Sequence, residues 1–132
     1  MHHNIDLAKH RLQTAEECLQ AAKKNLAINE YKTAVNRSYY CIFNAMRSVM
    51  ALYGEDFKSH TGLIKRFREE FIKTGIFSKE MNKTINELIQ VRNSSDYDDF
   101  YIVDKASVAQ QIEKAESFLR AVSHYITNDY SE

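Results

Sequence analysis

The chain has 132 residues, with 18 basic and 18 acidic side chains and a formal net charge of zero. This length predicts one domain with a continuous core that needs no disulfide or metal to hold it together. The balanced charge gives no global attraction to nucleic acid, and no apolar run approaches the roughly 20 residues that cross a bilayer. With no proline, only three glycines and no secretion leader, we expect a helical protein of the cytoplasm whose Cys18 and Cys41 stay reduced.

Two long helices are predicted in the first half of the chain. The first should begin at a capping Asn4 and carry one apolar stripe with alternating spacings of three and four residues. That stripe consists of Ile5, Ala8, Leu12, Ala15, Leu19, Ala22 and Leu26. The second should run from about Glu30 to Tyr53 and end at Gly54. Its apolar residues cover more than one stripe, so we expect this helix to be central or to serve two interfaces, of which a dimer surface is one.

The second half predicts a short amphipathic helix and two further long ones. The short helix follows the loop at Lys58 to His60 and ends at Gly75. A long helix should then start with Ser78 as its cap and run out near Arg92, and residues 93–99, which lack an apolar period, should form a break or a loosened helical end. The last helix should begin between residues 104 and 107. These elements predict an all-α, up-down-up-down four-helix bundle with one additional short helix, as a single domain over residues 1–132.

The strong signatures of catalysis and metal binding do not occur in the sequence. It contains no glycine-rich phosphate loop, no Cys-x-x-Cys pair, no His-Glu-x-x-His and no Gly-x-Ser-x-Gly elbow. The acidic cluster of Asp96, Asp98 and Asp99 lacks the glycine and the distal glutamate of a calcium-binding loop. No two histidines have the i, i+4 spacing of a helical zinc site. We therefore expect neither a metal nor a cofactor.

Charge is distributed unevenly along the chain, and two arginines lie in otherwise apolar helical patterns. Residues 58–92 contain eight basic and four acidic side chains, whereas residues 93–132 contain three and eight. Such a run permits a local anion site, although a solvated helix face also explains it. Arg37 is either a buried ion-pair partner or part of a site. Arg92 could grip a phosphate or carboxylate with its planar fork, or form a structural salt bridge to a nearby aspartate.

Three segments of the sequence resemble the HEPN superfamily, the higher eukaryotes and prokaryotes nucleotide-binding domains. They are Asn36-Arg37-Ser38-Tyr39-Tyr40-Cys41-Ile42-Phe43-Asn44-Ala45, Ser59-His60-Thr61-Gly62-Leu63 and Arg92-Asn93-Ser94-Ser95-Asp96-Tyr97-Asp98. The resemblance extends over nearly the whole chain and is closest to small stand-alone prokaryotic members. It implies a bundle of four or five helices, usually dimeric, in which arginines of two subunits meet across a cleft.

Many HEPN proteins are metal-independent ribonucleases, and others work beside a minimal nucleotidyltransferase in toxin-antitoxin or defence modules. Their catalytic pattern is an arginine followed four to six residues later by histidine. In this chain Arg92 matches the arginine, but Tyr97 stands where histidine would be, within an Arg-x-x-x-Asp-Tyr motif. The ordinary pKa of a tyrosine side chain is about 10, whereas that of histidine is about 6.5, so tyrosine is a poor proton acceptor at neutral pH. His60 could supply the missing imidazole only if the fold brings it close.

These observations leave three hypotheses. The first is a binding module in which Arg37, Tyr40, Arg92, Asp96 and Tyr97 hold a nucleotide or an RNA phosphate. The second is a weak or conditional endoribonuclease that uses Arg92 with Tyr97 or His60. The third is a purely interactive bundle whose apolar second helix docks a second copy of the chain or a nucleotidyltransferase subunit. The first and third are compatible, because a dimer interface can also form a cleft.

Overall fold

The computed structural model describes residues 2–129 of the backbone and the side chains of residues 4–128. Over this range the chain is helical apart from its connections. The elements are α1 (His2–Ala27), α2 (Tyr31–Leu52), α3 (His60–Phe67), the π-helical turn η1 (Arg68–Ile72), α4 (Lys79–Tyr97), α5 (Lys105–His124) and the π-helical turn η2 (Tyr125–Asp129). No helix of the described residues is both long enough and apolar enough to cross a membrane.

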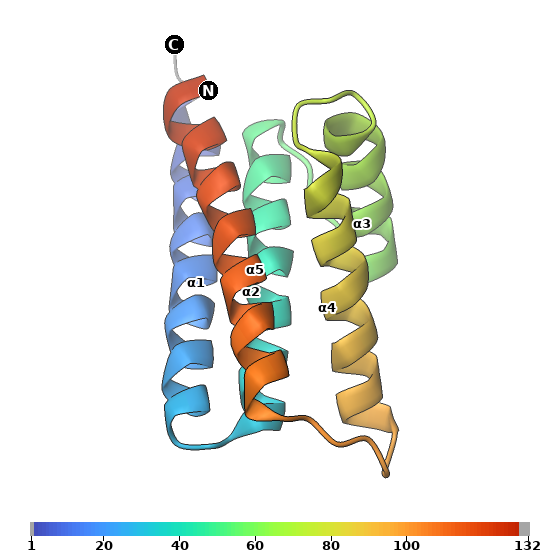
Figure 1. The fold of residues 1–132 in the computed structure, drawn as a ribbon. Helices are drawn as coiled ribbons and strands as arrows, with labels where there is room; N and C mark the ends of the chain where they lie inside the picture. The colour runs from blue at the N-terminus through green and yellow to red at the C-terminus, as the bar shows by residue number, and fades with distance from the viewer. Residues whose placement is uncertain (1, 130–132) are drawn as a thin grey trace.

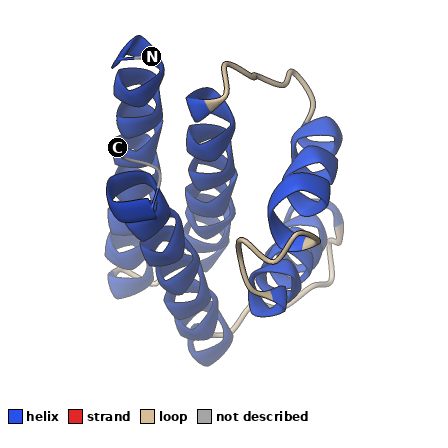
Figure 2. Ribbon diagram, turned by 90° about the horizontal axis from the view of Figure 1, so that it is seen from above, coloured by secondary structure: helices blue, strands red, loops and turns tan. Residues whose placement is uncertain are grey.

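The four long helices alternate in direction, which confirms the predicted all-α bundle. In Figure 1, α1 and α4 descend while α2 and α5 rise, and the shorter α3 lies beside α4. Figure 2 shows α2 in the middle, between the pair α1 and α5 on one side and the pair α3 and α4 on the other. The dense apolar pattern of α2 fits this central place, because a helix with neighbours on several sides must bury more than one stripe.

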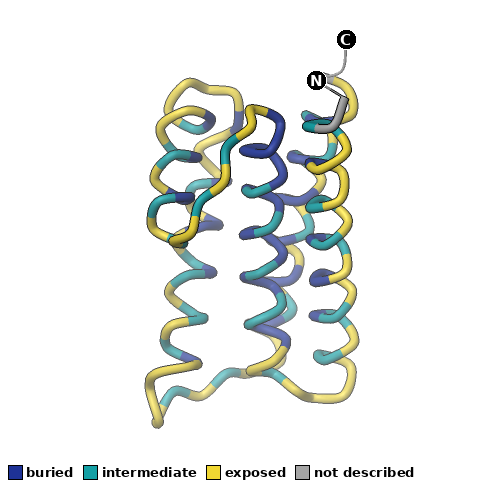
Figure 3. The backbone as a smooth tube through the Cα atoms, turned by 180° about the vertical axis from the view of Figure 1, so that it is seen from behind, coloured by how far each residue is buried: buried dark blue, intermediate teal, exposed yellow. Residues whose placement is uncertain are grey.

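Burial follows the sequence periodicity closely on α1. Ala8, Ala15, Leu19 and Ala22 are fully buried, and small alanines alternate with leucine, so α2 can approach closely. In Figure 3 the tube of α2 is mostly dark blue or teal, whereas the outer helices alternate between buried and exposed residues. Fourteen of the 22 residues of α2 are buried. The core is therefore centred on α2, and the other helices cover it.

Glycine ends the second helix, as its place in the sequence predicts. Gly54 has a φ of 73°, in the left-handed region that residues with a Cβ atom rarely adopt. Its N–H donates to the carbonyl of Ala51 at 3.1 Å, which satisfies one of the acceptors left over at the end of a helix. The chain can then turn sharply into the extended segment that leads to α3.

The predicted end of the third long helix, α4, is wrong. Helix α4 does not run out near Arg92 but continues to Tyr97, so the segment expected to break is helical through residue 97. Ser95, seven residues after Leu88, lies on the same inward face and is only 3% exposed. Tertiary packing of this small residue overrides the weak helix preference of the polar stretch. One further helical bond, from the Asp98 N–H to the Ser94 carbonyl at 3.0 Å, ends the helix.

Two predicted helix caps also differ from the structure. Helix α1 starts before Asn4, whose amide lies 3.5 Å from the carbonyl of Leu52 instead of capping the helix. Ser78 does stand at the N-cap of α4, but its side chain forms no capping hydrogen bond. By contrast, the caps of α3 and α5 are made by Ser59 and Asp104, which accept from backbone N–H groups of Gly62 and Ser107.

Candidate anion-binding site

The arginine singled out in the sequence lies against a pair of tyrosines on the neighbouring helix. The guanidinium carbon of Arg92, on α4, is 5.0 Å from the ring centroid of Tyr39 and 5.8 Å from that of Tyr40, both on α2. Such contacts attract a cation to the electron-rich ring face and are strengthened where water is displaced. The side chain of Arg92 is 20% exposed, so the rings hold the guanidinium near the surface of the bundle rather than deep inside it.

Asp96 contacts the same arginine from one turn further along α4. Its Oδ2 lies 3.3 Å from Nε of Arg92. The approach has the distance of an ion pair but not the geometry of a hydrogen bond, because Nε is buried and has no hydrogen-bond partner. The described residues give the terminal nitrogens of Arg92 no hydrogen bond either. The guanidinium is thus held by rings and one carboxylate while its strongest donors stay available.

His60, 32 residues before Arg92 in the sequence, belongs to the same aromatic cluster. Its Nδ1 lies 2.8 Å from the hydroxyl oxygen of Tyr39, and its ring centroid is 4.1 Å from that of Phe43. The ring also packs edge-on to Tyr40, with centroids 5.8 Å apart. His60 is the first residue of α3, and the cap made by Ser59 fixes that end of the helix. The fold therefore brings an imidazole to the tyrosines that hold Arg92.

The pKa values of His60 and Tyr39, the two partners of this hydrogen bond, are both shifted in the fold. Burial lowers the pKa of His60 below its usual value, and the charge of Arg92 lowers it further. Burial also raises the pKa of Tyr39 to about 12, so its hydroxyl keeps its proton at neutral pH. The pair is therefore neutral under ordinary conditions, a protonated phenol beside an uncharged imidazole.

The buried hydroxyl of Tyr39 decides which nitrogen of His60 carries the proton. Tyr39 is 2% exposed, and His60 is the hydrogen-bond partner of its hydroxyl among the described side chains. A buried O–H needs an acceptor, so the phenol donates and Nδ1 accepts. The proton of the neutral ring is then on Nε2. His60 accordingly presents a hydrogen-bond donor, and not a free lone pair, on the side away from Tyr39.

Arg37 contacts Tyr40 from the other end of the site. Its guanidinium carbon is 5.1 Å from the Tyr40 ring centroid, and Nε donates to the amide oxygen of Asn36 at 3.0 Å. Nη1 lies 3.9 Å from the sulfur of Cys18. None of these partners is a carboxylate, so the charge of Arg37 is not neutralised by its contacts. Tyr40 is thus the ring that two cations share.

The structure does not bring Tyr97 into this cluster. The residue is the last of α4 and is 76% exposed. It lies five residues after Arg92, which on a helix turns its side chain well away from that of Arg92. The predicted role of Tyr97 in binding or catalysis stays a prediction. Tyr39 and Phe43, in contrast, are site residues that the sequence interpretation left out of the candidate set, although their i, i+4 spacing on α2 places them on one face.

No metal site accompanies the cluster. Within the described residues, no group of three or more histidine, cysteine, aspartate or glutamate side chains is close enough to hold a metal ion. Asp96, Asp98 and Asp99 do not converge, because the first lies on α4 and the others lie beyond its end. The groups that the described residues bring together at the site are a guanidinium, an imidazole and phenol rings.

Comparisons with known proteins give the same relationship that the sequence motifs indicate. A model of the HEPN domain matches residues 8–125. A UPF0332 protein of Thermotoga maritima is 36% identical over 112 residues, which cover 85% of each chain. "Putative toxin MJ0142" of Methanocaldococcus jannaschii is 30% identical over 115 residues, 87% of this chain and 78% of the relative. A UPF0332 protein of Archaeoglobus fulgidus is 26% identical over 125 residues, 95% of this chain and 99% of the relative.

Proposed function

The chain belongs to the HEPN family, and from this premise we propose that it is a toxin-like member that binds a nucleotide or an RNA phosphate through Arg92. One observation carries the proposal: the guanidinium of Arg92 rests on Tyr39 and Tyr40, beside an imidazole, with donors left free. Two relatives of Methanocaldococcus jannaschii whose names contain the words "putative toxin" support the assignment to the toxin-like branch.

The binding mode follows from the donors that face the site. A phosphate has several acceptor oxygens, and a guanidinium can donate to two of them at once. The Nε2–H of His60 can add a neutral donor, and Arg37 adds a second positive charge beside Tyr40. Asp96 contacts the guanidinium at Nε and not at its terminal nitrogens. Tyr40, the partly exposed ring of the pair, provides an aromatic edge that a base can contact.

The binding proposal predicts a specific loss when Arg92 is replaced. We expect Arg92→Ala to weaken binding of a short labelled RNA and of mononucleotides by about tenfold or more, the loss of one charge-assisted contact. Arg92→Lys keeps the charge but loses the planar guanidinium, so its affinity should lie between those of wild type and Arg92→Ala. Arg120→Ala is the matched control, because Arg120 is exposed and paired with Glu16 and Glu116 on the opposite side of the bundle. Equal affinities for wild type and Arg92→Ala would remove the arginine from the proposal.

A second candidate function is metal-independent cleavage of RNA, which the placement of His60 beside the Arg92 cluster favours. Cleavage through the 2'-hydroxyl needs a group that takes a proton, and His60 could do so only from the other tautomer, with Nδ1–H donating to Tyr39. Arg92 would stabilise the charged phosphate. The expected products carry 2',3'-cyclic ends and form in the presence of a chelator. If wild type and Arg92→Ala leave RNA equally intact, the chain is a binding protein without this activity.

We further propose that the protein acts as a pair of chains together with a minimal nucleotidyltransferase encoded beside it. The family premise supports both parts of this assembly, and most of the apolar surface of α2 is buried inside the bundle. Light scattering on the purified chain tests the pair, and co-purification with the neighbouring gene product tests the partner. A monomer that co-purifies with no nucleotidyltransferase would overturn the assembly and leave the ligand proposal standing.

A further inference from the structure

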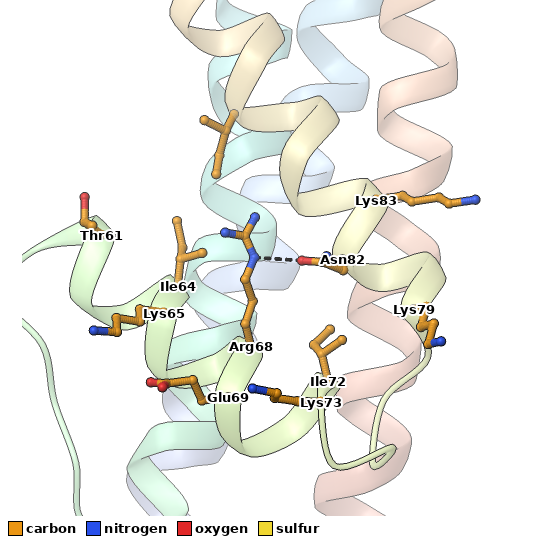
Figure 4. A pocket seen from close by; sticks show the side chains of 11 residues that line it. Thr61, Ile64, Lys65, Arg68, Glu69, Ile72, Lys73, Lys79, Asn82 and Lys83 are labelled. Carbon is orange, nitrogen blue, oxygen red and sulfur yellow. Dashed lines mark hydrogen bonds between the residues drawn. The ribbon is translucent and has the colours of Figure 1, made fainter.

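A groove runs along the line where α3 and η1 lie beside α4. It has a volume of about 860 Å³, and five cations and one acid border it, namely Lys65, Arg68, Lys73, Lys79, Lys83 and Glu69. Figure 4 shows Arg68 near the middle of the groove, Lys65 on the α3 side and Lys83 on the α4 side. Positive charge therefore lies on both borders of the groove.

The floor between these borders is apolar. It consists of Ile64, which is 7% exposed, and of Ile72 and Ile89, which pack against the core but stay partly open to water. Along α4 the lining extends from Lys79 to Ile89, which is about 15 Å of helix. Covering such a strip with apolar side chains removes it from water, so a partner with an apolar face gains free energy from contacting this floor.

The cations of the groove lack acidic partners. In the described part of the chain none of the five forms an ion pair, and Arg68 is held instead by the amide oxygens of Asn82, at 2.7 Å, and of Asn86. Elsewhere in the molecule arginines are paired with carboxylates, as Arg120 is with Glu16. The positive charge of the groove is therefore not balanced within the described fold, and an acidic partner is favoured there.

One end of the groove lies beside the anion-binding site. Thr61, which lines the groove, follows His60 directly in α3. Ile89 lies three residues before Arg92, about one turn away on a similar face of α4. An occupant that fills the groove along its length therefore ends next to the aromatic cluster that holds Arg92.

The arrangement of charge and apolar surface favours a helix over a nucleic acid strand as the occupant. Proteins that bind single strands offer aromatic rings on which bases stack, and the described lining of this groove contains isoleucines but no aromatic ring. An amphipathic helix that lies in a groove buries one apolar stripe and keeps its polar side chains at the two edges. Acidic side chains at both edges would meet the cations on both borders.

We infer that the groove binds an acidic amphipathic helix of about three turns from a partner protein. Its apolar stripe covers the isoleucines, and its carboxylates pair with the cations on the two borders. The inference goes beyond the proposed function and uses none of the ligand chemistry assigned to Arg92. Because the groove ends beside His60, the bound helix also narrows the approach to the anion-binding site.

A synthetic peptide tests the docking site directly. The probe is a fluorescent peptide of about 14 residues, with leucines three and four residues apart and glutamates on both sides of that stripe. Fluorescence anisotropy should show saturable binding to the full chain. A peptide of the same composition with its leucines scattered, and one with glutamine in place of glutamate, should each bind at least about tenfold more weakly, because each lacks one of the two kinds of contact.

Substitutions in the groove test which residues hold the probe. Lys65→Glu with Lys83→Glu reverses one exposed cation on each border and should weaken binding of the acidic peptide by about tenfold or more, with a smaller loss at high salt. Lys9→Glu with Lys24→Glu makes the same charge change on exposed residues of α1 and should leave the affinity unchanged. Ile72→Ser changes the floor without changing charge and should also weaken binding by about tenfold. Circular dichroism shows whether each variant is folded.

The inference is overturned if wild type does not bind the acidic peptide, binds the scattered peptide as tightly, or binds no better than the folded Lys65 and Lys83 variant. Two of these failures identify another occupant. If wild type ignores the peptide and the variant loses binding of single-stranded RNA, the groove serves RNA; if the variant instead changes its sedimenting mass, a second copy covers the groove. Arg92→Ala should lose mononucleotides and keep the peptide, so a wild type without mononucleotide binding counts against the proposed function alone.

Discussion

The two sides of helix α2 are built from different kinds of residue. Toward α1 and α5 the packing uses small and aliphatic side chains, such as the fully buried Ala15 and Leu19, and the buried thiol of Cys41 contacts the carbonyl of Ala115 at 3.9 Å. Toward α3 and α4 the packing combines fully buried apolar side chains such as Leu63 and Ile85 with a polar cluster of Tyr39, an imidazole and a guanidinium. The first side gains stability from apolar burial, while the second places polar groups where water and ligands reach them.

This difference teaches where stability and function lie in the molecule. Burial raises the pKa of the Cys41 thiol, which keeps it protonated and unreactive on the apolar side. On the other side, burial perturbs Tyr39 and His60 in a way that prepares hydrogen-bond donors. Since one helix carries both faces, substitutions on α1 should change stability without changing binding, and substitutions at the aromatic cluster should change binding at a smaller cost in stability.

The largest expected effect is on the apolar side. Leu19→Ala removes a fully buried side chain between α1 and α2 and should lower the free energy of unfolding by about 2 to 5 kcal/mol. Urea denaturation monitored by circular dichroism measures it. Leu7→Ala on the same helix is the control, because Leu7 is 42% exposed and its replacement should cost less than about 0.5 kcal/mol. Similar costs for the two variants would mean that the face of α1 is assigned wrongly.

A smaller effect is expected where the two tyrosines meet the histidine. Tyr39→Phe removes the hydroxyl that donates to Nδ1 of His60 and should cost about 1 kcal/mol of stability. It should also free the imidazole to change tautomer, which nitrogen chemical shifts in NMR spectra detect. Tyr31→Phe removes a hydroxyl whose hydrogen bond to Asn29 is exposed, and it serves as the control. An unchanged His60 tautomer in Tyr39→Phe would contradict the donor role assigned to the phenol.

The smallest effect is a pH dependence. The pKa of His60 is lowered in the folded chain, so the unfolded chain binds this proton more readily. Stability should therefore fall as the pH drops through the usual histidine value of about 6.5 toward the lowered one, and level off below it. We expect the melting temperature of His60→Gln to fall less than that of wild type between about pH 7.5 and pH 5.5. His10→Gln, an exposed histidine of α1, should follow wild type; if His60→Gln does so as well, His60 does not couple folding to protons.

The sequence by itself determined the helices and most of their ends. Apolar spacing and the glycine at the end of α2 act through neighbours within a few residues, so they can be read locally. The Arg92 motif and the family relationship were also present in the sequence. The continuation of α4 to Tyr97 was not, because it depends on the burial of Ser95 against other helices.

The tertiary structure decided which of the candidate residues form a site. Arg92 meets the tyrosine pair across 52 residues of sequence, and His60 joins them because α3 begins where α2 and α4 lie close together. Tyr97, adjacent to Arg92 by motif, points elsewhere and stays exposed. Spacing along one helix fixes only the direction of a side chain. Which residues that side chain contacts depends on how separate helices pack, and this packing is a property of the whole core.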